Sequence, residues 1–325
     1  MGDLARLSGG SFLVMGRAGM DLYADPPGTR AEEALRFTTA LGGSAANIAV
    51  ALVRQGCRAA LVTRVSDDAV GRFCLRQLDD YGIDRRHVQV QSGDARTSLA
   101  LVETRAVDCQ SVIYRNNAAD FAMNMADIEA VDFAAHSALV ATGTGLAAEP
   151  SRSASFRAFE LARAAGLPVV LDLDYRPYSW PSALMASVAC ARAAALADVI
   201  VGNDLEFDVM AGSAGKGLEK ARSLSAEGAR IVIYKMGEKG AITLTPEGEF
   251  ATGIYPTRAL KPTGAGDSFL GAFLAALSLG HPVRDAVLRG SAAAAMVVAR
   301  VACAPAMPSR AELDEFLASH PGPTA

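Results

Sequence analysis

Short apolar segments alternate with amphipathic segments along most of this 325-residue chain, and this alternation limits the possible folds more than any other feature. Six apolar runs end at or near a glycine or an acid, as buried strands do: residues 11–16, 59–65, 138–142, 168–172, 199–202 and 230–235. Helical spacing of apolar residues recurs between them, in residues 45–55, 69–81, 153–165, 182–196 and 218–225. This order predicts one α/β domain over residues 1–325, with a mostly parallel sheet covered by helices on both faces. Functional residues are then expected at the carboxyl ends of the strands.

Two early segments interrupt the alternation. Residues 21–40 and 97–114 lack a helical period, and parts of them are rich in residues that favour strands. We expect them to form a small, half-exposed β-sheet. It would project from the main domain as a lid, made of about residues 17–40 and 95–119.

Composition narrows the class of protein. The net charge of −4 and the pI of about 5.7 argue against nucleic acid or an acidic membrane as the main partner. Five cysteines are scattered without metal-ligand spacing, which indicates a reduced, cytoplasmic protein. The apolar stretch 290–307 is interrupted by Arg300, so we expect a buried helix there and not a membrane span.

The most informative motif is KPTGAGDSFLGAFLAAL, residues 261–277. Its apolar residues lie three and four positions apart, which predicts a helix with one face in the core: Phe269, Leu270, Phe273, Leu274 and Leu277. Thr263 is the expected N-cap, and Gly280 marks the expected end. The backbone amides of Gly264, Ala265 and Gly266 would point out of the helix start, where a phosphate can approach them.

Asp267 lies in the first turn of this expected helix. A carboxylate is repelled by a bound phosphate, so its position needs a reason. One reason is catalytic, because Asp267 can take the proton of a substrate hydroxyl that attacks the phosphate. The other is structural, because acids stabilise the first turn of a helix. The motif alone does not separate these alternatives.

A second glycine motif, LGGSAANIAV at residues 41–50, places Gly42 and Gly43 before another expected helix, with Asn47 one turn further on. Asp21 follows the first strand and a short loop. Backbone amides near glycines, together with these polar side chains, suit a ligand with many hydroxyl groups. The structural alternative is a tight turn, a helix packed on the sheet and a solvated loop acid.

Polar residues also follow two later strands. Arg176, in LDLDYRPYSW at residues 171–180, offers a fork to a phosphate or carboxylate, or else pairs with Asp174. Asn203 and Glu206 are three residues apart on an expected helix. They can hold water-coordinated Mg²⁺ beside a triphosphate, or form a capping box, or do both.

Two further glycine-containing turns have competing interpretations. Lys235, Gly237 and Gly240 fit a turn beneath the phosphates of a nucleotide, and a hairpin turn explains them nearly as well. Residues 143–148, GTGLAA, match a dinucleotide-binding fingerprint, which makes an NAD-dependent dehydrogenase a rival. The acid of that fingerprint comes late, at Asp172, and the motif does not follow the first strand, so a kinase is favoured.

Three motifs together resemble the signatures of the ribokinase-like carbohydrate kinases, the PfkB family. They are GGSAANIA at residues 42–49, NDLE at 203–206 and PTGAGDSFLGAF at 262–273. The resemblance covers nearly the whole chain in order. It implies a ribokinase-like α/β fold with a small β-sheet lid, ATP and Mg²⁺ as cofactors, and a homodimer formed through the lid.

The resemblance also implies roles for individual residues. Asp267 would be the catalytic base, and the anion hole would be formed by Gly264, Ala265 and Gly266. The sugar would be bound by Asp21, Gly42, Gly43, Asn47, Arg115 and Arg176. The nucleotide would be bound by Asn203, Lys235, Gly237, Gly240, Thr263, Gly264 and Gly266, and Mg²⁺ would be held through water by Asn203 and Glu206. Segments 253–263 and 290–303 would border adenine.

A monovalent cation such as K⁺ near the anion hole is a further implication of the resemblance. Many members have an Asp before the Thr-Gly-Ala-Gly-Asp run, and here that position is Pro262. A proline lacks both the carboxylate and the backbone N–H. The departure therefore bears on the cation site and not on the base.

Two segments narrow the expected substrate. Residues 113–120, IYRNNAAD, and 171–180 resemble the members that act on acidic keto-deoxy sugars. The implied acceptor is 5-dehydro-2-deoxy-D-gluconate of inositol breakdown, or alternatively 2-dehydro-3-deoxygluconate. Arg115 and Arg176 offer a carboxylate bidentate partners that a neutral sugar does not need. A non-catalytic sensor of sugar acids or nucleotides is the alternative from another class, and retention of Asp267 argues against it.

Overall fold

The main sheet of the protein contains nine described strands in the order 13-12-11-10-9-8-1-4-5. The computed structural model describes residues 2–105, 107–320 and 322–323. From β11 to β5 the strands run parallel, while β12 and β13 are antiparallel additions at one edge. In chain order, the strands are β1 (Ser11–Met15), β4 (Arg58–Ser66), β5 (Val88–Gln91), β8 (Ala138–Thr142), β9 (Val169–Asp172), β10 (Val199–Asn203), β11 (Ile231–Lys235), β12 (Ala241–Thr245) and β13 (Gly248–Thr252).

The predicted α/β architecture is confirmed. Each of the six expected strands and five expected helices is present, with ends that differ by at most two residues. The expected helices are α1 (Ser44–Arg54), α2 (Ala69–Asp80), α4 (Ser151–Ala164), α5 (Ala183–Ala194) and α7 (Gly217–Ala226). Also present are α3 (Met125–Glu129), α6 (Asp204–Ala211), α8 (Ala265–Ser278), α9 (Val283–Val298) and α10 (Arg310–Ser319).

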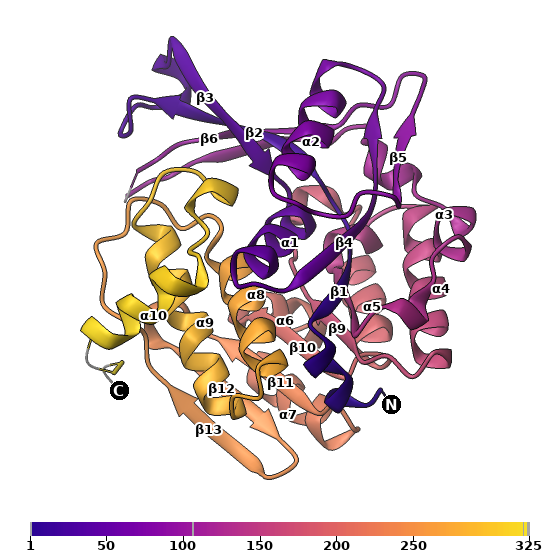
Figure 1. Cartoon of the computed structure of the whole chain (residues 1–325), viewed down its shortest axis with the longest axis vertical. Coiled ribbons are helices and arrows are strands. Elements are labelled where there is room, and N and C mark those ends of the chain that lie inside the picture. The colour runs from indigo at the N-terminus through magenta and orange to yellow at the C-terminus, as the bar shows by residue number, and fades with distance from the viewer. Residues whose placement is uncertain (1, 106, 321, 324–325) are drawn as a thin grey trace.

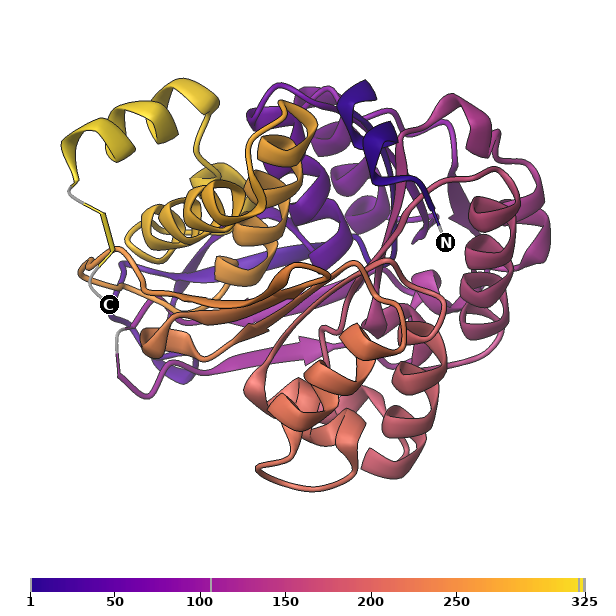
Figure 2. The same ribbon diagram turned by 90° about the horizontal axis from the view of Figure 1, so that it is seen from below.

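Helices cover both faces of the main sheet (Figure 2), and strand alternation explains why. In β1, Phe12 and Val14 point into a core shared with α1, α8 and α9. Leu13 and Met15 point the other way, into a core shared with α4, α5 and α6. Successive side chains of a strand face opposite sides, so a strand buried on both faces is apolar at every position.

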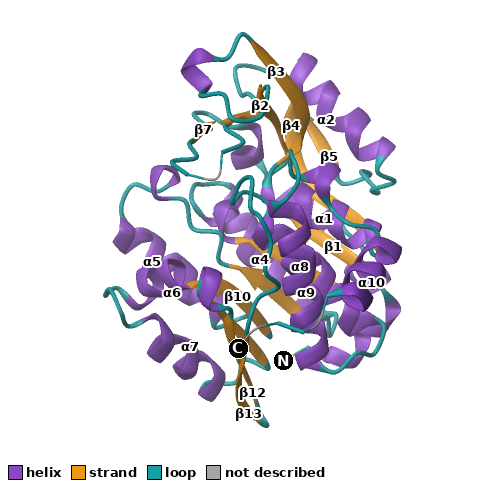
Figure 3. Ribbon diagram, turned by 90° about the vertical axis from the view of Figure 1, so that its left-hand side faces the viewer, coloured by secondary structure: helices purple, strands orange, loops and turns teal. Residues whose placement is uncertain are grey.

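A second, four-stranded sheet lies beside the carboxyl ends of the main strands (Figures 1 and 3). Its order is β3 (Arg36–Gly42), β2 (Gly19–Asp25), β6 (Ser98–Val102), β7 (Ser111–Tyr114). This confirms the predicted small sheet from the two early segments. Tyr23 and Ala100 of this second sheet pack against Ala302 and Cys303, which follow α9. Its role as a lid stays a prediction.

The start of α8 differs from the expected one. Gly264, and not Thr263, is the N-cap, and it makes no side-chain capping bond. Its φ of +84° lies in the left-handed region, which a β-branched residue such as threonine avoids. The other end agrees with expectation, because the helix stops at Ser278 and Gly280 follows with φ +83°.

The stretch 290–307 begins inside α9, whose buried side chains pack on α8. This part of the stretch is the buried helix that was expected. Across the described residues, the helices lack the combination of length and apolar character that crossing a bilayer requires.

Candidate active site

Polar side chains meet where the parallel strands end. Asp172 ends β9, Asn203 ends β10 and Lys235 ends β11. Asn203 is in register with Lys235, and Asp172 is in register with Val201 on the same strand as Asn203. The carboxyl edge of the sheet therefore gathers the residues that the sequence singled out, as expected for an open α/β sheet.

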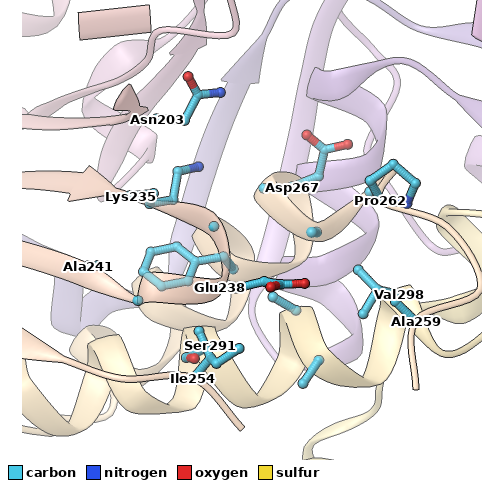
Figure 4. Close-up of a pocket in the computed structure, with 18 of the residues that line it drawn as sticks. Asn203, Lys235, Glu238, Ala241, Ile254, Ala259, Pro262, Asp267, Ser291 and Val298 are labelled. Carbon is cyan, nitrogen blue, oxygen red and sulfur yellow. The ribbon is translucent and has the colours of Figure 1, made fainter. Parts of the chain in front are cut away.

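A pocket of about 670 Å³ opens between this edge and the start of α8. In the view of Figure 4, Asn203, Lys235 and Asp267 lie at one end, and Ile254 and Ser291 lie at the other. The second end is mostly apolar and is bordered by two segments, residues 252–262 and 291–298. A pocket with one charged end and one apolar end matches the shape and polarity of a nucleoside triphosphate.

The N-terminus of α8 forms part of the charged end of the pocket. Gly264, Ala265 and Gly266 line the pocket, and the first amides of a helix have no acceptor within it. A Cβ on Gly264 would lie 2.8 Å from Sγ of Cys303, so only glycine fits this turn against the neighbouring segment. Nζ of Lys235 lies beside Gly266, which adds a positive charge to the same point.

Asp267 is partly exposed to this pocket and not turned into the core. Its Oδ2 accepts a hydrogen bond of 2.8 Å from Nδ2 of Asn47 on α1. A Cβ on Gly271 would lie only 2.3 Å from Cβ of Ala51, so the missing side chain lets α8 approach α1 closely. This close approach carries Asn47 to Asp267 and thereby brings the two glycine motifs of the sequence together.

Burial raises the pKa of Asp267 to about 6, and the negative charge of Asp174 acts in the same direction. The hydrogen bond from Asn47 and the charges of Arg176 and Arg17 oppose that shift. A carboxylate with a pKa near 6 is ionised at neutral pH and is a stronger base than an ordinary aspartate.

Asn203 and Glu206 form a capping box at the start of α6. Oε2 of Glu206 accepts from the backbone of Asn203 at 2.7 Å, and Oε1 accepts from the backbone of Tyr175 at 3.1 Å. The structural alternative is therefore present, and both residues still line the pocket. Asp172 and Asp174 lie at the same end, where burial raises the pKa values of Asp172 and Glu206.

The carboxylates of Asp172, Asp174 and Glu206 give this end of the pocket a negative charge, which favours a hydrated divalent cation. The described residues contain no group of three metal-ligating side chains close enough to bind an ion directly. Mg²⁺ keeps several waters and needs only one or two protein ligands beside a triphosphate. The donors therefore fit Mg²⁺ held through water by Asn203 and Glu206.

Lys235 at the end of β11, and Gly237 and Gly240 in the connection to β12, line the pocket. The two strands are antiparallel neighbours, so the hairpin that the sequence offered as an alternative is present. Gly237 and Gly240 both have positive φ values, +59° and +82°. A Cβ on Gly240 would lie 2.0 Å from the carbonyl oxygen of Thr252, so this turn packs closely on β13.

Of the residues expected to bind a sugar, Asp21 and Gly42 lie on strands of the second sheet, and Gly43 and Asn47 lie at the start of α1. Asp21 on β2 is buried and accepts a hydrogen bond of 2.9 Å from the hydroxyl of Tyr23. A Cβ on Gly42 would lie 2.0 Å from Oδ1 of Asp21, so this glycine makes room for the carboxylate. Gly43, with φ +93°, packs against the backbone of Arg17. Burial raises the pKa of Asp21, against the opposing charge of Arg17.

Arg115 is buried beside the second sheet, where it forms an ion pair with Asp120. Its guanidinium stacks 4.0 Å from the ring centre of Phe121 and donates from Nη2 to the carbonyl oxygen of Thr144 at 3.2 Å. In the described part of the chain, Nε and Nη1 of Arg115 have no hydrogen-bond partner. Buried donors without partners are rare in proteins, so these two nitrogens call for an explanation.

Arg176 lines the pocket, but its guanidinium is already paired. Its Nη2 lies 2.8 Å from Oδ1 of Asp174, and Nη1 lies 3.9 Å from Glu206. Of the two alternatives that the sequence offered for Arg176, the ion pair with Asp174 is therefore present. The side chain of Arg176 is 43% exposed, so it can still contact a ligand without offering an unpaired charge.

Sequence reasoning missed two cations of this region. Arg17, in the loop after β1, is buried, and its charge acts on Asp21 and Asp267. A charged residue between the glycines that follow the first strand was a usable signal for Arg17. Lys261 is fully buried next to the anion-binding turn, and the sequence carried no sign of that burial.

The rival dinucleotide fingerprint does not form its required structure. Residues 143–146 form a short 3-10 helix that is buried, and α4 begins only at Ser151. A Cβ on Gly143 would lie 2.1 Å from the carbonyl oxygen of Leu173, so this glycine serves packing against the end of β9. The helix start that would bind a pyrophosphate is therefore missing from this motif.

Comparison with known proteins agrees with this geometry. The model of the pfkB family carbohydrate kinases matches residues 11–310. A 5-dehydro-2-deoxygluconokinase of Geobacillus kaustophilus is 38% identical over 314 residues, which cover 95% of this chain and 94% of that protein. A 5-dehydro-2-deoxygluconokinase of Photobacterium profundum is 38% identical over 311 residues, covering 94% of both.

Among solved structures, a double mutant of fructokinase from Vibrio cholerae superposes with a TM-score of 0.83 at 26% identity. The match covers 94% of this chain and 98% of the fructokinase, which was crystallised with fructose, ADP and a potassium ion. The ribokinase-like fold expected from the sequence is thereby confirmed.

Proposed function

The chain belongs to the pfkB family of carbohydrate kinases, and from that premise we propose that it phosphorylates a keto-deoxy sugar acid, 5-dehydro-2-deoxy-D-gluconate, with ATP. The curated relatives with that name, 38% identical over nearly the whole chain, support this substrate. The structural observation that carries the proposal is Arg115, a buried guanidinium with two donors free for a carboxylate.

In the proposed reaction, Asp267 takes the proton of the primary hydroxyl of the sugar acid. The hydroxyl oxygen attacks the γ-phosphorus in line, the bond to the β–γ bridging oxygen breaks, and ADP leaves. Gly264, Ala265 and Gly266 direct backbone amides at the transferring phosphoryl group, and Lys235 adds its charge. Asn47 holds the carboxylate of Asp267 in place through its hydrogen bond.

Mg²⁺ fits beside Asn203 and Glu206 through water, and when bound it neutralises charge on the triphosphate. The apolar end of the pocket, with Ile254, Ala295 and Val298, suits the adenine ring. The second sheet then acts as a lid that excludes water from the transferring group and limits wasteful hydrolysis of ATP. Asp21, Gly42, Gly43 and Asn47 bind sugar hydroxyls beneath it.

The acid end of the substrate is assigned to the arginines near the second sheet. Arg115 is the main partner, and Arg17 lies in the same region, since both charges act on Tyr178. Both arginines pair with an acid, Arg115 with Asp120 and Arg176 with Asp174, and Arg115 is preferred because two of its nitrogens have no partner among the described residues. 2-Dehydro-3-deoxygluconate is the alternative acceptor, because it presents the same carboxylate. A non-catalytic sensor is disfavoured by the carboxylate of Asp267, which is partly exposed to the pocket and has a pKa raised to about 6.

A phosphorylation screen tests the proposal. Purified protein with Mg-ATP is offered 5-dehydro-2-deoxy-D-gluconate, 2-dehydro-3-deoxygluconate, fructose and ribose, and ADP release is followed by a coupled assay. We expect the highest kcat/KM with the first compound. Equal rates with neutral sugars would contradict the assignment of the carboxylate site, and ADP release with none of them would favour the sensor.

We further propose a homodimer formed through the second sheet, in a reducing cytoplasm. Several apolar side chains of that sheet and its loops are exposed: Leu35, Val107, Val112 and Tyr114. Exposed apolar side chains on this sheet favour a protein partner. All five cysteines carry free thiols, which suits a reducing compartment. Light scattering after gel filtration tests the dimer, and the double substitution Val112→Lys/Tyr114→Lys should yield monomers.

A further inference from the structure

Lys261 is a fully buried lysine directly beside the anion-binding turn. Its Nζ donates to the backbone carbonyl of Thr263 at 2.6 Å and lies 3.4 Å from that of Val297. No carboxylate of the described residues forms an ion pair with it within 4.0 Å. Lysines are almost never fully buried without a paired charge, because an ammonium loses much hydration free energy in the interior. Its position therefore calls for a specific role.

The carbonyls that Lys261 contacts belong to the proposed anion-binding turn and to the helix behind it. Thr263 immediately precedes Gly264, and Val297 is in the last turn of α9. Gly264 packs on both Val297 and Cys303, so Nζ ties the phosphate-binding turn to the segment behind it. The titratable groups that act on this ammonium are Cys303, Asp21, Asp267 and Cys109, and burial lowers its pKa.

We infer that the ammonium of Lys261 is a built-in monovalent cation, which organises the anion hole and makes the kinase independent of K⁺. An ammonium group and K⁺ are similar in size, and both are coordinated by carbonyl oxygens. K⁺ does not fit behind this turn, because Nζ of Lys261 already donates to the carbonyl oxygen of Thr263 and its positive charge repels a second cation. The fixed positive charge also favours the negative charge that develops on the transferring phosphoryl group.

The wild-type protein gives the first test. Initial rates with Mg-ATP and the sugar acid are measured in chloride salts of K⁺, Na⁺ and tetramethylammonium at equal ionic strength. We expect kcat/KM values that agree within about twofold. Activation by K⁺ of roughly tenfold or more over tetramethylammonium, which is too large to enter a carbonyl cage, would overturn the inference.

Two substitutions at one position separate charge from packing. Lys261→Ala removes the charge and leaves space, so activity should fall and K⁺ or ammonium ions should restore it. Lys261→Met removes the charge and fills the space, so activity should fall and no cation should restore it. Lys216→Met, at an exposed lysine before α7, is the matched control and should behave as wild type in every salt. Full activity of Lys261→Met, or a loss in Lys261→Ala that no cation repairs, would contradict the inference.

Cation binding can also be measured without turnover, which separates this inference from the proposed substrate. K⁺ should raise the melting temperature of Lys261→Ala but not of the wild type, each relative to tetramethylammonium. In crystals soaked with Rb⁺, anomalous scattering should show an ion beside the carbonyl of Thr263 only in Lys261→Ala. A Rb⁺ ion at that place in the wild type would overturn the inference. This measurement on wild-type crystals remains decisive even if Lys261→Ala fails to fold or no substrate is found.

Discussion

Nδ2 of Asn47 and Oδ2 of Asp267 form a hydrogen bond of 2.8 Å across the contact between α1 and α8, although the two residues are 220 positions apart. The bond joins the glycine motif before α1 to the proposed anion-binding turn before α8. An N–H donor stabilises the ionised form of a carboxylate and fixes its orientation. Asn47 is therefore a positioning residue for the proposed base, as well as a candidate sugar ligand.

The pH dependence of turnover should report the ionisation of Asp267. The pKa of Asp267 is raised to about 6, and a general base acts only when deprotonated. In the free enzyme, kcat/KM should be flat above that pH and should fall about tenfold per pH unit below it. Asn47→Ala removes the hydrogen bond that lowers this pKa, so its acidic limb should move to higher pH. A limb unchanged by Asn47→Ala would contradict the link between the two residues.

Arg115→Lys should weaken the binding of sugar acids selectively. Lysine keeps the charge that pairs with Asp120 but loses the fork that can grip a carboxylate. We expect KM for the sugar acid to rise roughly tenfold or more, the equivalent of about 1.5–3 kcal/mol for a hydrogen bond to a charged group. KM for ATP should stay unchanged. Arg36→Lys, at an exposed arginine of the same sheet, is the control. An equal loss for both substrates would indicate a general structural defect.

Lys235→Met should weaken the binding of ATP. Nζ of Lys235 lies beside Gly266, and the substitution removes its charge at the phosphate end of the pocket. The KM for ATP should rise roughly tenfold to a hundredfold, again about 1.5–3 kcal/mol. Titration of a fluorescent ATP analogue checks the binding directly. Lys220→Met on α7, outside the pocket, is the control, and unchanged ATP affinity in Lys235→Met would remove Lys235 from the site.

Gly271→Ala should destabilise the protein and disturb the site together. The new Cβ would lie 2.3 Å from Cβ of Ala51, so α1 and α8 must separate. Overpacking costs about 1–3 kcal/mol, which outweighs a gain of up to about 1 kcal/mol in helix propensity. Denaturant unfolding measures the loss, and kcat should fall because Asn47 moves away from Asp267. The double variant Ala51→Gly/Gly271→Ala should recover part of both, and no recovery would place the strain elsewhere.

The sequence was most informative where local pattern and tertiary environment agree. Strands buried on both faces must be apolar throughout, so β1 and β8 could be predicted to within a residue. The position of the helix start at α8 could be predicted because small residues precede an apolar run with helical spacing, while its role in binding an anion stays a prediction. The N-cap was wrong by one residue, because the helix begins after Gly264, whose φ of +84° and close approach to Cys303 both depend on the missing side chain.

Pairings between distant residues could not be predicted from the sequence. The Asp174–Arg176 pair, at 2.8 Å, was one of two alternatives that the sequence offered. No local pattern indicates that Arg115 contacts the carbonyl oxygen of Thr144, or that two of its nitrogens have no partner among the described residues. The burial of Lys261 was equally hidden, since a lysine in a loop is usually solvated. Its role depends on the carbonyl of Val297, which only the packing of α9 against α8 brings close.

The measurement that tests the account most directly is the turnover of Asp267→Asn with the sugar acid and Mg-ATP. Asparagine keeps the size of the side chain but cannot accept the proton of the attacking hydroxyl. Turnover should fall by about 10³-fold or more, while the affinity for ATP stays within about twofold of the wild type. Substantial phosphorylation by Asp267→Asn would show that another group is the base and would contradict the mechanism.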